Sequence, residues 1–563
     1  MNINKNHQYE SLYIMEFFYS VFQETMEKVD MLMGKAAEES RPYDHKYTAR
    51  ELLQSLLSHE RIQQQDDLSK SAQALIEYIL GVNHFETEEI TESEKHYIKC
   101  LDHLLSLPLP IRAKYVNTCQ DVLNALGILR CNRGENDAGM GYFDKASGLY
   151  QAIKTIHKGD FSHNFKDYLK GSGEFRFIIE GGVNPRKAEQ NYTLTLFYMA
   201  QAYSKLGNKH KSASFCAETL KRQMISGDYD MKDWAINCIN MAEYYVENKY
   251  ISQAIYILEC GLSIVTGKRR KLRSTLNMQL GRAYRSLLDL SVDTDKNKST
   301  IPDEINQQIL ALEMLSPQFR TLTFPTEIEP AKEIFKVANN HFKVALEYFI
   351  IDGYVTEHIE MKKDISGLYK SLCYFEKSDA RVMAMLGRRL ELIEGFSKEI
   401  NKQSYSTLWQ HLMNEIASIY LDMYELKALA ANEMKKEAKR LEKHSVANGF
   451  ALTCIEKHVE MLDFIQKFDM NDDTAKDIIQ SSLNLMFGVA RLYSKLEDAD
   501  VRVRVGYMEK SFRWYERIQS YLNETKNGKY AAKVPDLNEQ IKICDEMIAL
   551  MPIRISQVNA QMS

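Results

Sequence analysis

The sequence predicts an all-α protein, a tetratricopeptide-like right-handed α-solenoid of antiparallel helix pairs arranged in two halves. The first observation is composition, because only 10 prolines and 25 glycines occur in 563 residues, and low usage of both favours long helices. The second observation is a signature of small and aromatic residues that recurs along the N-terminal half. The third is that no segment has the pattern of β-strands joined by hairpin turns.

The repeat signature is L-G-x-x-Y on one helix and A-x-x-x-F on the next. Small residues allow two antiparallel helices to approach closely, and aromatic residues fill the gaps between neighbouring pairs. Four segments match the small residue of the first helix, namely Gly81, Gly127, Ala200 and Ala242. One match would be weak, but four in order predict an array of helix pairs.

The remaining signature positions of these four segments also follow the pattern. The tyrosine position of the first helix holds, in order, His84, Arg130, Tyr203 and Tyr245. The second helix then supplies a small residue and a bulkier one four positions later: Ser93 and Tyr97, Gly139 and Phe143, Ser212 and Cys216, Ala254 and Leu258. The sequence between residues 205 and 208 contains a glycine where a helix is expected to stop.

The spacing of the repeats sets the domain boundaries that we expect. The step from Gly127 to Ala200 is longer than the other steps, and a glycine-rich insertion at about residues 154–189 accounts for it. A polar stretch at residues 291–308 begins a linker. We therefore predict an N-terminal segment at residues 1–45, an N-terminal half at 46–290, a linker at 291–330 and a C-terminal helical-repeat half at 331–563.

Composition excludes several classes of function. The formal net charge is −5 and the isoelectric point is about 6.3, so the basic footprint of a nucleic-acid binder is missing. No run of about 18 apolar residues predicts insertion into a membrane, and the first residues do not resemble a secretory signal. We expect a cytoplasmic protein.

The sequence lacks the motifs of an enzyme or a metal site. The nine cysteines form no C-x-x-C pair, and their odd number argues against a disulfide framework or a structural zinc site. No phosphate-binding loop, H-E-x-x-H or G-x-S-x-G motif occurs, and the histidines have no ligand spacing. We expect no catalysis, no cofactor and no metal, with an enzyme on a helical scaffold as the remote alternative.

Several short segments of the sequence resemble, in the same order, segments of a known protein family. The longest are LGVNHFETEEITESEKHYIKCL at residues 80–101 and FIIDGYVTEHIE at residues 349–360. Shorter ones are KYTARELL at 46–53, NALGIL at 124–129, YMAQAY at 198–203, TLKRQ at 219–223, WAIN at 234–237, RRLELI at 388–393 and ARLY at 490–493. Together they resemble the kinesin-binding (KIF-binding) protein family between about residues 46 and 493.

The resemblance implies two tetratricopeptide-like halves forming a curved solenoid, and a partner, the motor domain of certain kinesins. It implies that the motor's microtubule-binding helix is held in the concave groove, which controls microtubule attachment. An indirect link to microtubules, a cytoplasmic and cytoskeleton-associated location, and roles in axonal transport, axon outgrowth and microtubule organisation would follow.

The resemblance also suggests partner-binding residues in the groove. Family members use the tyrosine and glutamine of Y-x-x-Q and the glutamine of T-L-K-R-Q as motor contacts, which correspond to Tyr198, Gln201 and Gln223. Asn240 precedes a core methionine as Tyr198 does, so we expect the two to be neighbours across the groove. The plainer interpretation is that all four are ordinary polar residues lining it.

A basic run in the second half is a further candidate. It consists of Lys435, Lys436, Lys439, Arg440 and Lys443, several of which share one face of a helix. Such a stripe would steer an acidic partner surface towards the protein. The plainer interpretation is a solvated helix face.

A different binding function is the main alternative. A tetratricopeptide cochaperone, or a general adaptor for peptide termini, grips a terminal carboxylate with clustered lysine, asparagine and arginine side chains on successive first helices. The third repeat offers Phe197, Tyr198 and Gln201 at those positions instead. Affinity for an acidic C-terminal peptide would favour this alternative.

Overall fold

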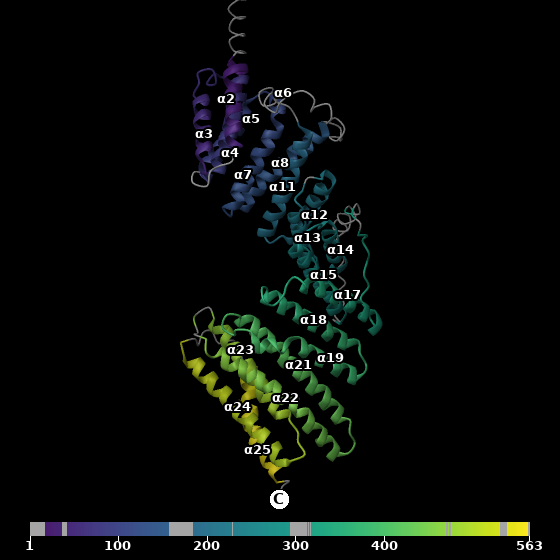
Figure 1. Cartoon of the computed structure of the whole chain (residues 1–563). Helices are drawn as coiled ribbons and strands as arrows, with labels where there is room; N and C mark the ends of the chain where they lie inside the picture. The colour runs from purple at the N-terminus through teal and green to yellow at the C-terminus, as the bar shows by residue number, and fades with distance from the viewer. Residues whose placement is uncertain are drawn as a thin grey trace, which may run out of the picture. The chain divides into compact units, whose positions relative to one another are not determined.

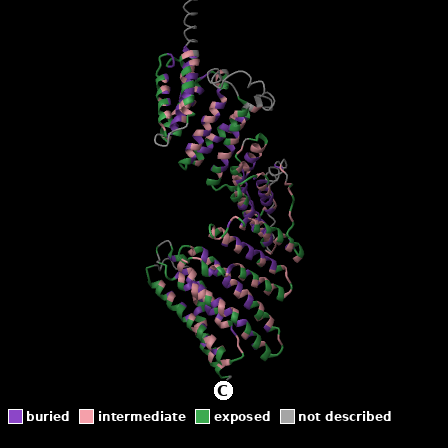
Figure 2. Cartoon of the chain, viewed as in Figure 1, coloured by how far each residue is buried: buried purple, intermediate pink, exposed green. Residues whose placement is uncertain are grey.

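The computed structural model describes residues 17–35, 42–156, 184–227, 229–292, 312, 315, 317–468, 471, 474–529 and 538–560. Within these ranges every regular element is helical, which confirms the predicted all-α fold (Figure 1). Successive helices pack as antiparallel pairs, and each helix buries one stripe of residues against its neighbours (Figure 2). None of these helices has the length and apolar character needed to cross a bilayer.

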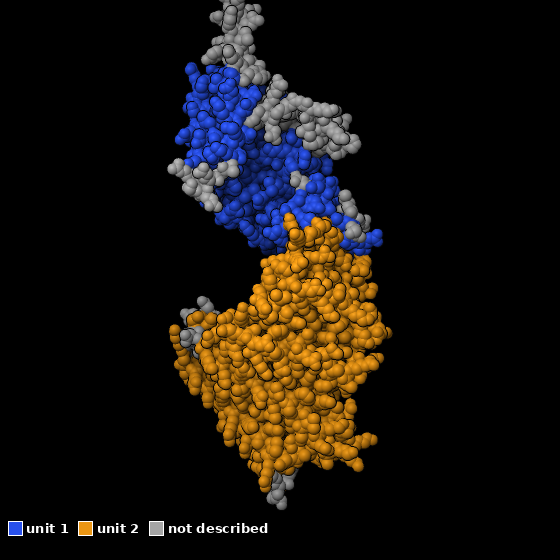
Figure 3. Space-filling view, in the orientation of Figure 1, with its two compact units in different colours: residues 1–244, 300–319 blue, residues 245–299, 320–563 orange. Residues whose placement is uncertain are grey.

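The chain divides into two compact units, drawn in different colours in Figure 3. Unit 1 comprises residues 1–244 and 300–319, and unit 2 comprises residues 245–299 and 320–563. The boundaries of these compact units differ from those of the expected halves, residues 46–290 and 331–563. The two halves describe the organisation of the repeats and remain a prediction. Most of the expected insertion and linker, residues 157–183 and 293–311, lies outside the described residues.

The first described element of unit 1 is one turn of π-helix, η1, at Phe18–Phe22. A 3₁₀ turn, η2, lies further along at Ala113–Tyr115. Its helices up to the first insertion are α2 (Gln23–Met33), α3 (Asp44–Leu57), α4 (Asp67–Glu86), α5 (Ile90–Ser106), α6 (Leu109–Arg112), α7 (Val116–Asn132) and α8 (Asn136–Ile156). After the insertion follow α11 (Pro185–Lys205), α12 (Lys209–Ser226) and α13 (Met231–Glu247), and the unit boundary after Tyr244 falls within the last turn of α13.

Unit 2 contains the remaining helices of the described residues. They are α14 (Ile251–Ile264), α15 (Arg270–Val292), α17 (Ile328–Leu346), α18 (Val355–Phe375), α19 (Asp379–Ile393), α20 (Phe396–Glu399), α21 (Ser406–Asn432), α22 (Glu437–Ile465), α23 (Ala475–Lys495), α24 (Val501–Asn527) and α25 (Asn538–Asn559). The pairs α15 with α17, α18 with α19, α21 with α22 and α23 with α24 pack along their lengths.

The first two predicted helix pairs are formed as the signature requires. A Cβ atom on Gly81 of α4 would lie 2.6 Å from the ring of Tyr97 on α5. A Cβ atom on Gly127 of α7 would lie 2.5 Å from the ring of Phe143 on α8. Both glycines are buried, so close approach of the two helices depends on the missing side chain.

The third and fourth segments place their small residues in the interior as well. Ala200 and Ala242 are 7% and 2% exposed. In the third pair the ring of Tyr203 on α11 stacks on Phe215 of α12, with centroids 5.5 Å apart. The predicted helix stop is also confirmed, because α11 ends at Lys205 and Gly207 adopts a φ of 76°, which favours glycine.

The structure contains a further, fifth helix pair with the full repeat signature, which we did not predict from the sequence. Leu280, Gly281 and Tyr284 on α15 form L-G-x-x-Y, and Ala338 and Phe342 on α17 form A-x-x-x-F. A Cβ atom on Gly281 would lie 2.8 Å from the ring of Phe342, as in the first two pairs. Residues 293–327 separate the two halves of the motif, so the expected linker lies within a helix pair.

The polar residues at the tyrosine positions of the first two repeats are structural. His84 is buried, stacks on His96 with a centroid distance of 4.9 Å, and its Nδ1 lies 2.6 Å from Oε2 of Glu89. Arg130 forms an ion pair with Glu94 of the preceding helix pair. Both positions therefore join neighbouring helices through polar contacts rather than through a phenol ring.

Candidate functional site

The strongest sequence candidates, Tyr198 and Gln201, lie one turn apart on α11. Gln201 is exposed, and it has no hydrogen-bond partner among the described residues. The ring of Tyr198 is half-buried and stacks on Phe143 of α8, with centroids 6.1 Å apart and an interplanar angle of 10°. This partial burial raises the pKa of the Tyr198 phenol.

Tyr198 therefore has a packing role that the sequence did not reveal. Its ring covers Phe143, the aromatic residue that packs on Gly127 in the second pair. The Tyr198 hydroxyl, in contrast, has no hydrogen-bond partner in the described part of the chain. An aromatic ring held rigidly with an unoccupied hydroxyl is suited to anchor a partner at low entropic cost.

Gln223 lies on the second helix of the third pair, near the C-terminal end of α12. The preceding residue, Arg222, donates from Nη1 to Oε2 of Glu189 on α11 at 2.8 Å. Since Glu189 precedes Tyr198 by nine positions, and an α-helix rises about 1.5 Å per residue, Gln223 lies roughly 14 Å along α11 from Tyr198. Its Oε1 is buried without a hydrogen-bond partner in the described ranges.

Arg222 is a residue that sequence reasoning missed at this position. Its guanidinium carbon lies 4.4 Å from the ring centroid of Tyr192, which stacks on Tyr150 at 3.9 Å. It also pairs with Glu218 and Glu189. These contacts fix the end of α12 against α11 and thereby position Gln223. In the sequence, Arg222 lies 30 or more positions from Tyr192 and Tyr150. No local pattern therefore indicates that these three side chains are in contact.

Asn240 is exposed on α13 and belongs to unit 1. The residue after Asn240 is Met241, which is buried at 3% exposure. The residue after Tyr198 is Met199, which is likewise buried at 4% exposure. The two helices thus present corresponding positions in the same register. Proximity of Asn240 and Tyr198 across the surface stays a prediction.

All four candidate residues belong to unit 1. Among the described residues, no hydrogen bond connects any two of them. Tyr198 and Gln201 share a helix face, Asn240 occupies the corresponding position two helices later, and Gln223 lies towards the opposite end of α11. We call Tyr198, Gln201 and Asn240 the α11/α13 surface. It can offer hydroxyl and amide groups to a partner, and it has no acid–base pair for catalysis.

The basic run is only partly an exposed stripe. Arg440 donates from Nη1 to Oε2 of Glu497 at 2.8 Å, so it ties α22 to the residues after α23. The four lysines are exposed and form no ion pair in the described part of the chain: Lys435, Lys436, Lys439 and Lys443. Lys435 and Lys436 precede α22 and Lys439 lies in its first turn, where a cation opposes the helix dipole, so the dipole does not favour lysines at these three positions.

The described residues contain no cluster of three or more histidine, cysteine, aspartate or glutamate side chains placed to hold a metal ion. None of the nine cysteines forms a disulfide.

Comparison with known proteins identifies relatives of the whole chain. The model of the family described as "KIF-1 binding protein C terminal" matches residues 285–558. The KIF-binding protein of Gallus gallus is 25% identical, and the alignment covers 93% of this chain and 94% of that protein. The KIF-binding protein of Drosophila melanogaster is 22% identical, with coverage of 97% and 98%.

A solved structure has the same fold. The structure titled "Kinesin binding protein (KBP)" superimposes with a TM-score of 0.63 at 24% sequence identity, covering 95% of this chain and 97% of that one. The family model and the full-length relatives show that the chain is similar to KIF-binding proteins over nearly its whole length, and the solved structure shows that it shares their fold.

Proposed function

We propose that this protein binds the motor domains of kinesins and thereby controls their attachment to microtubules. The observation that carries the proposal is the alignment with KIF-binding proteins over nearly the full length of both chains. Stacked helix pairs provide extended surfaces for holding a segment of another protein, and no catalytic step is required. A cytoplasmic, cytoskeleton-associated location and roles in axonal transport and axon outgrowth belong to the same proposal.

The α11/α13 surface is the region where we propose that the motor's microtubule-binding helix lies. The free hydroxyl of Tyr198 and the exposed amides of Gln201 and Asn240 are available as hydrogen-bond partners. Gln223, about 14 Å along α11 from Tyr198, would contact a second point on the same partner. Its buried, unpartnered Oε1 would be satisfied by a donor from that partner.

The test is binding of a panel of kinesin motor domains to the full chain, measured by isothermal titration calorimetry. The double variant Tyr198→Phe and Gln201→Ala keeps the stacked ring while removing the hydroxyl and the amide. We expect it to weaken binding by about 10- to 100-fold, which corresponds to a loss of roughly 1.4–2.8 kcal/mol for the hydroxyl and the amide together. Its thermal unfolding should match that of the wild type.

Two outcomes would contradict the proposal. Failure of the folded wild-type chain to bind any motor would reject kinesin binding itself. Unchanged affinity of the double variant would keep kinesin binding but remove the α11/α13 surface from it. Val446→Ser, which changes an exposed apolar residue on α22, serves as a control for non-specific loss.

The exposed lysines at the start of α22 contribute to the same proposal by steering an acidic surface of the partner. Charge complementarity acts mainly on the association rate. Lys439→Glu with Lys443→Glu should therefore slow association at low salt by about tenfold and leave dissociation near the wild-type rate. Stopped-flow kinetics at two ionic strengths would check this, and an unchanged association rate would exclude steering.

A further inference from the structure

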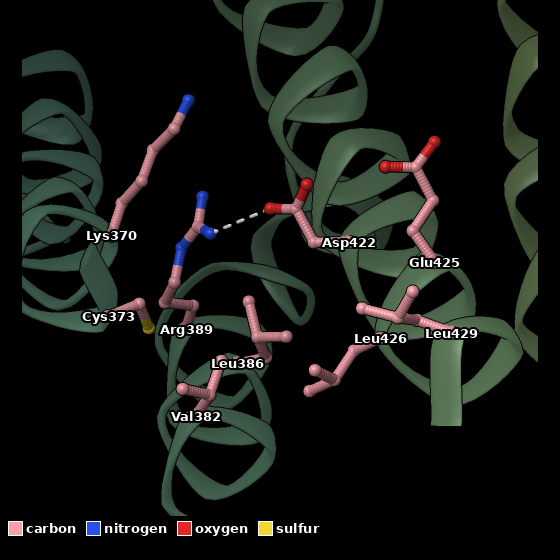
Figure 4. A pocket seen from close by; sticks show the side chains of 9 residues that line it. All are labelled: Lys370, Cys373, Val382, Leu386, Arg389, Asp422, Glu425, Leu426 and Leu429. Carbon is pink, nitrogen blue, oxygen red and sulfur yellow. Dashed lines mark hydrogen bonds and ion pairs between the residues drawn. The ribbon is translucent and has the colours of Figure 1, made fainter. Parts of the chain in front are cut away.

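A pocket opens among three helices of unit 2. It has a volume of about 320 Å³ and receives side chains from α18, α19 and α21. Its lining consists of Lys370, Cys373, Val382, Leu386, Arg389, Asp422, Glu425, Leu426 and Leu429 (Figure 4). This volume is at the lower end of the range for binding sites, and it suits one or two side chains of a partner.

The lower part of the pocket is apolar. In Figure 4, Val382 and Leu386 of α19 face Leu426 and Leu429 of α21 across it. Leu429 is 63% exposed, so this wall leaves a large aliphatic side chain mostly in water. Burial raises the pKa of the Cys373 thiol to about 11, and it therefore stays neutral beside the apolar wall. An apolar group that entered would remove this surface from water.

The charged end of the pocket contains one group that is already neutralised. The Arg389 side chain is 1% exposed, and its Nη2 lies 2.6 Å from Oε1 of Glu415. Its Nη1 also lies 3.3 Å from Oδ2 of Asp422, the interaction dashed in Figure 4. Enclosed by these two carboxylates, Arg389 cannot receive an anionic ligand.

Three other charged groups remain accessible. The Asp422 side chain is 40% exposed, and its Oδ1 has no partner among the described residues. Glu425 is exposed and forms no ion pair there, and Lys370 on the opposite wall forms none either. Glu415 balances the charge of Arg389. The carboxylates of Asp422 and Glu425 then face the single ammonium of Lys370, so the mouth of the pocket has an excess of one negative charge.

We propose that this pocket binds a basic peptide segment of a protein partner. A leucine-type side chain lies on the apolar wall, and a neighbouring lysine or arginine lies between Asp422 and Glu425. Lys370 opposes a cation on the α18 side, so the basic residue approaches along α21. This inference rests on the charges and walls of unit 2 and is independent of the kinesin-binding proposal.

The first test uses two matched probes with the full chain, N-acetyl-leucyl-arginine amide and N-acetyl-leucyl-glutamate amide. Ligand-observed saturation-transfer NMR detects weak binding to a large protein through the leucine methyl signals. We expect saturation of the arginine peptide and an effect at least about fivefold smaller for the glutamate peptide, because the probes share the leucine and carry opposite charges on the second side chain. Equal signals, or a stronger signal from the glutamate peptide, would overturn the proposal.

The second test uses variants at exposed positions, which should not disturb folding. Leu429→Ser and Glu425→Lys should each reduce binding of the arginine peptide by about fivefold or more, whereas Lys370→Gln should strengthen it. The controls are Val446→Ser, an exposed apolar residue outside the pocket, and Glu442→Lys, an exposed glutamate on α22. Equal losses in test and control variants, or weaker binding to Lys370→Gln, would contradict the assignment.

Discussion

Single glycines set the distance between paired helices at three places in this protein. Gly81, Gly127 and Gly281 each face an aromatic ring on the following helix, so closely that a Cβ atom would lie within 2.8 Å of ring carbons. The rings of Tyr97, Phe143 and Phe342 are themselves buried. A methyl group at these glycines would have to displace a ring that has no free space.

Replacing Gly127 by alanine should therefore lower the free energy of unfolding by about 1–3 kcal/mol, the usual range for overpacking. The matched control is Gly141→Ala on α8, where no atom lies within 4 Å of the added methyl group. Because alanine favours helix, this variant should be stabilised by up to about 1 kcal/mol. Chemical denaturation would measure both, and equal effects would refute the role of close approach.

The Tyr198 side chain shows why residue roles cannot be read from a motif alone. The sequence placed it on a partner-facing surface, and the structure adds that its ring stacks on Phe143. A change to alanine would remove the packing together with the hydroxyl. The change to phenylalanine isolates the hydroxyl, and for this reason it is the variant that tests partner binding.

At the scale of helices, α15 is joined to α18 through one carboxylate, which pairs with two arginines of α15. Asp364 of α18 is 8% exposed and accepts hydrogen bonds from Nε of Arg282 at 2.8 Å and from Nη1 of Arg285 at 2.5 Å. The guanidinium of Arg285 also covers Gly367, one turn further along α18. The α15–α18 contact thus depends on a charge cluster in addition to apolar packing.

Asp364→Asn should lower the free energy of unfolding by about 1–3 kcal/mol, because two partly buried arginines lose their common counter-ion. The comparison is Glu329→Gln, which removes an exposed ion pair with Lys332 within α17 and should leave unfolding unchanged. Thermal and urea unfolding of both variants would test this. Equal stability of Asp364→Asn and wild type would show that the cluster is dispensable.

Local patterns were sufficient to predict the first helix pairs, because both halves of each signature lie close together in the chain. The fifth pair escaped prediction, although Gly281 and Phe342 form a complete signature, since residues 293–327 separate its helices. Contacts between residues that are far apart in the sequence could not be predicted from local patterns either. Arg440 was assigned to an exposed stripe, whereas its partner Glu497 lies 57 positions away.

Across the whole molecule, buried and partly buried histidines make stability depend on pH. Burial is the main cause that lowers the pKa of His84, His103, His341, His444 and His458 below the ordinary value of 6.5. The unfolded chain therefore takes up protons near pH 6.5, and the folded chain does so only at lower pH. Over this window the unfolded state binds more protons, so folding stability falls as pH falls.

We expect the unfolding midpoint to decrease as the pH is lowered from 7.5 to 5.5 and to change little between pH 7.5 and 8.5, where histidines are neutral in both states. Circular dichroism at the helix band during heating would record it. A midpoint that stayed constant or rose on acidification would show that these histidines are accommodated in their charged form.

We propose that this folded helical-repeat protein holds a kinesin motor domain on the α11/α13 surface. Photo-reactive benzoylphenylalanine placed at Gln201 or at Asn240 tests this directly, with the same residue at Leu109, which is 67% exposed on α6, as the control. We predict cross-links to a bound motor domain from positions 201 and 240 and none from position 109. A motor that binds but forms cross-links only from position 109, or equally from all three positions, would contradict the claim.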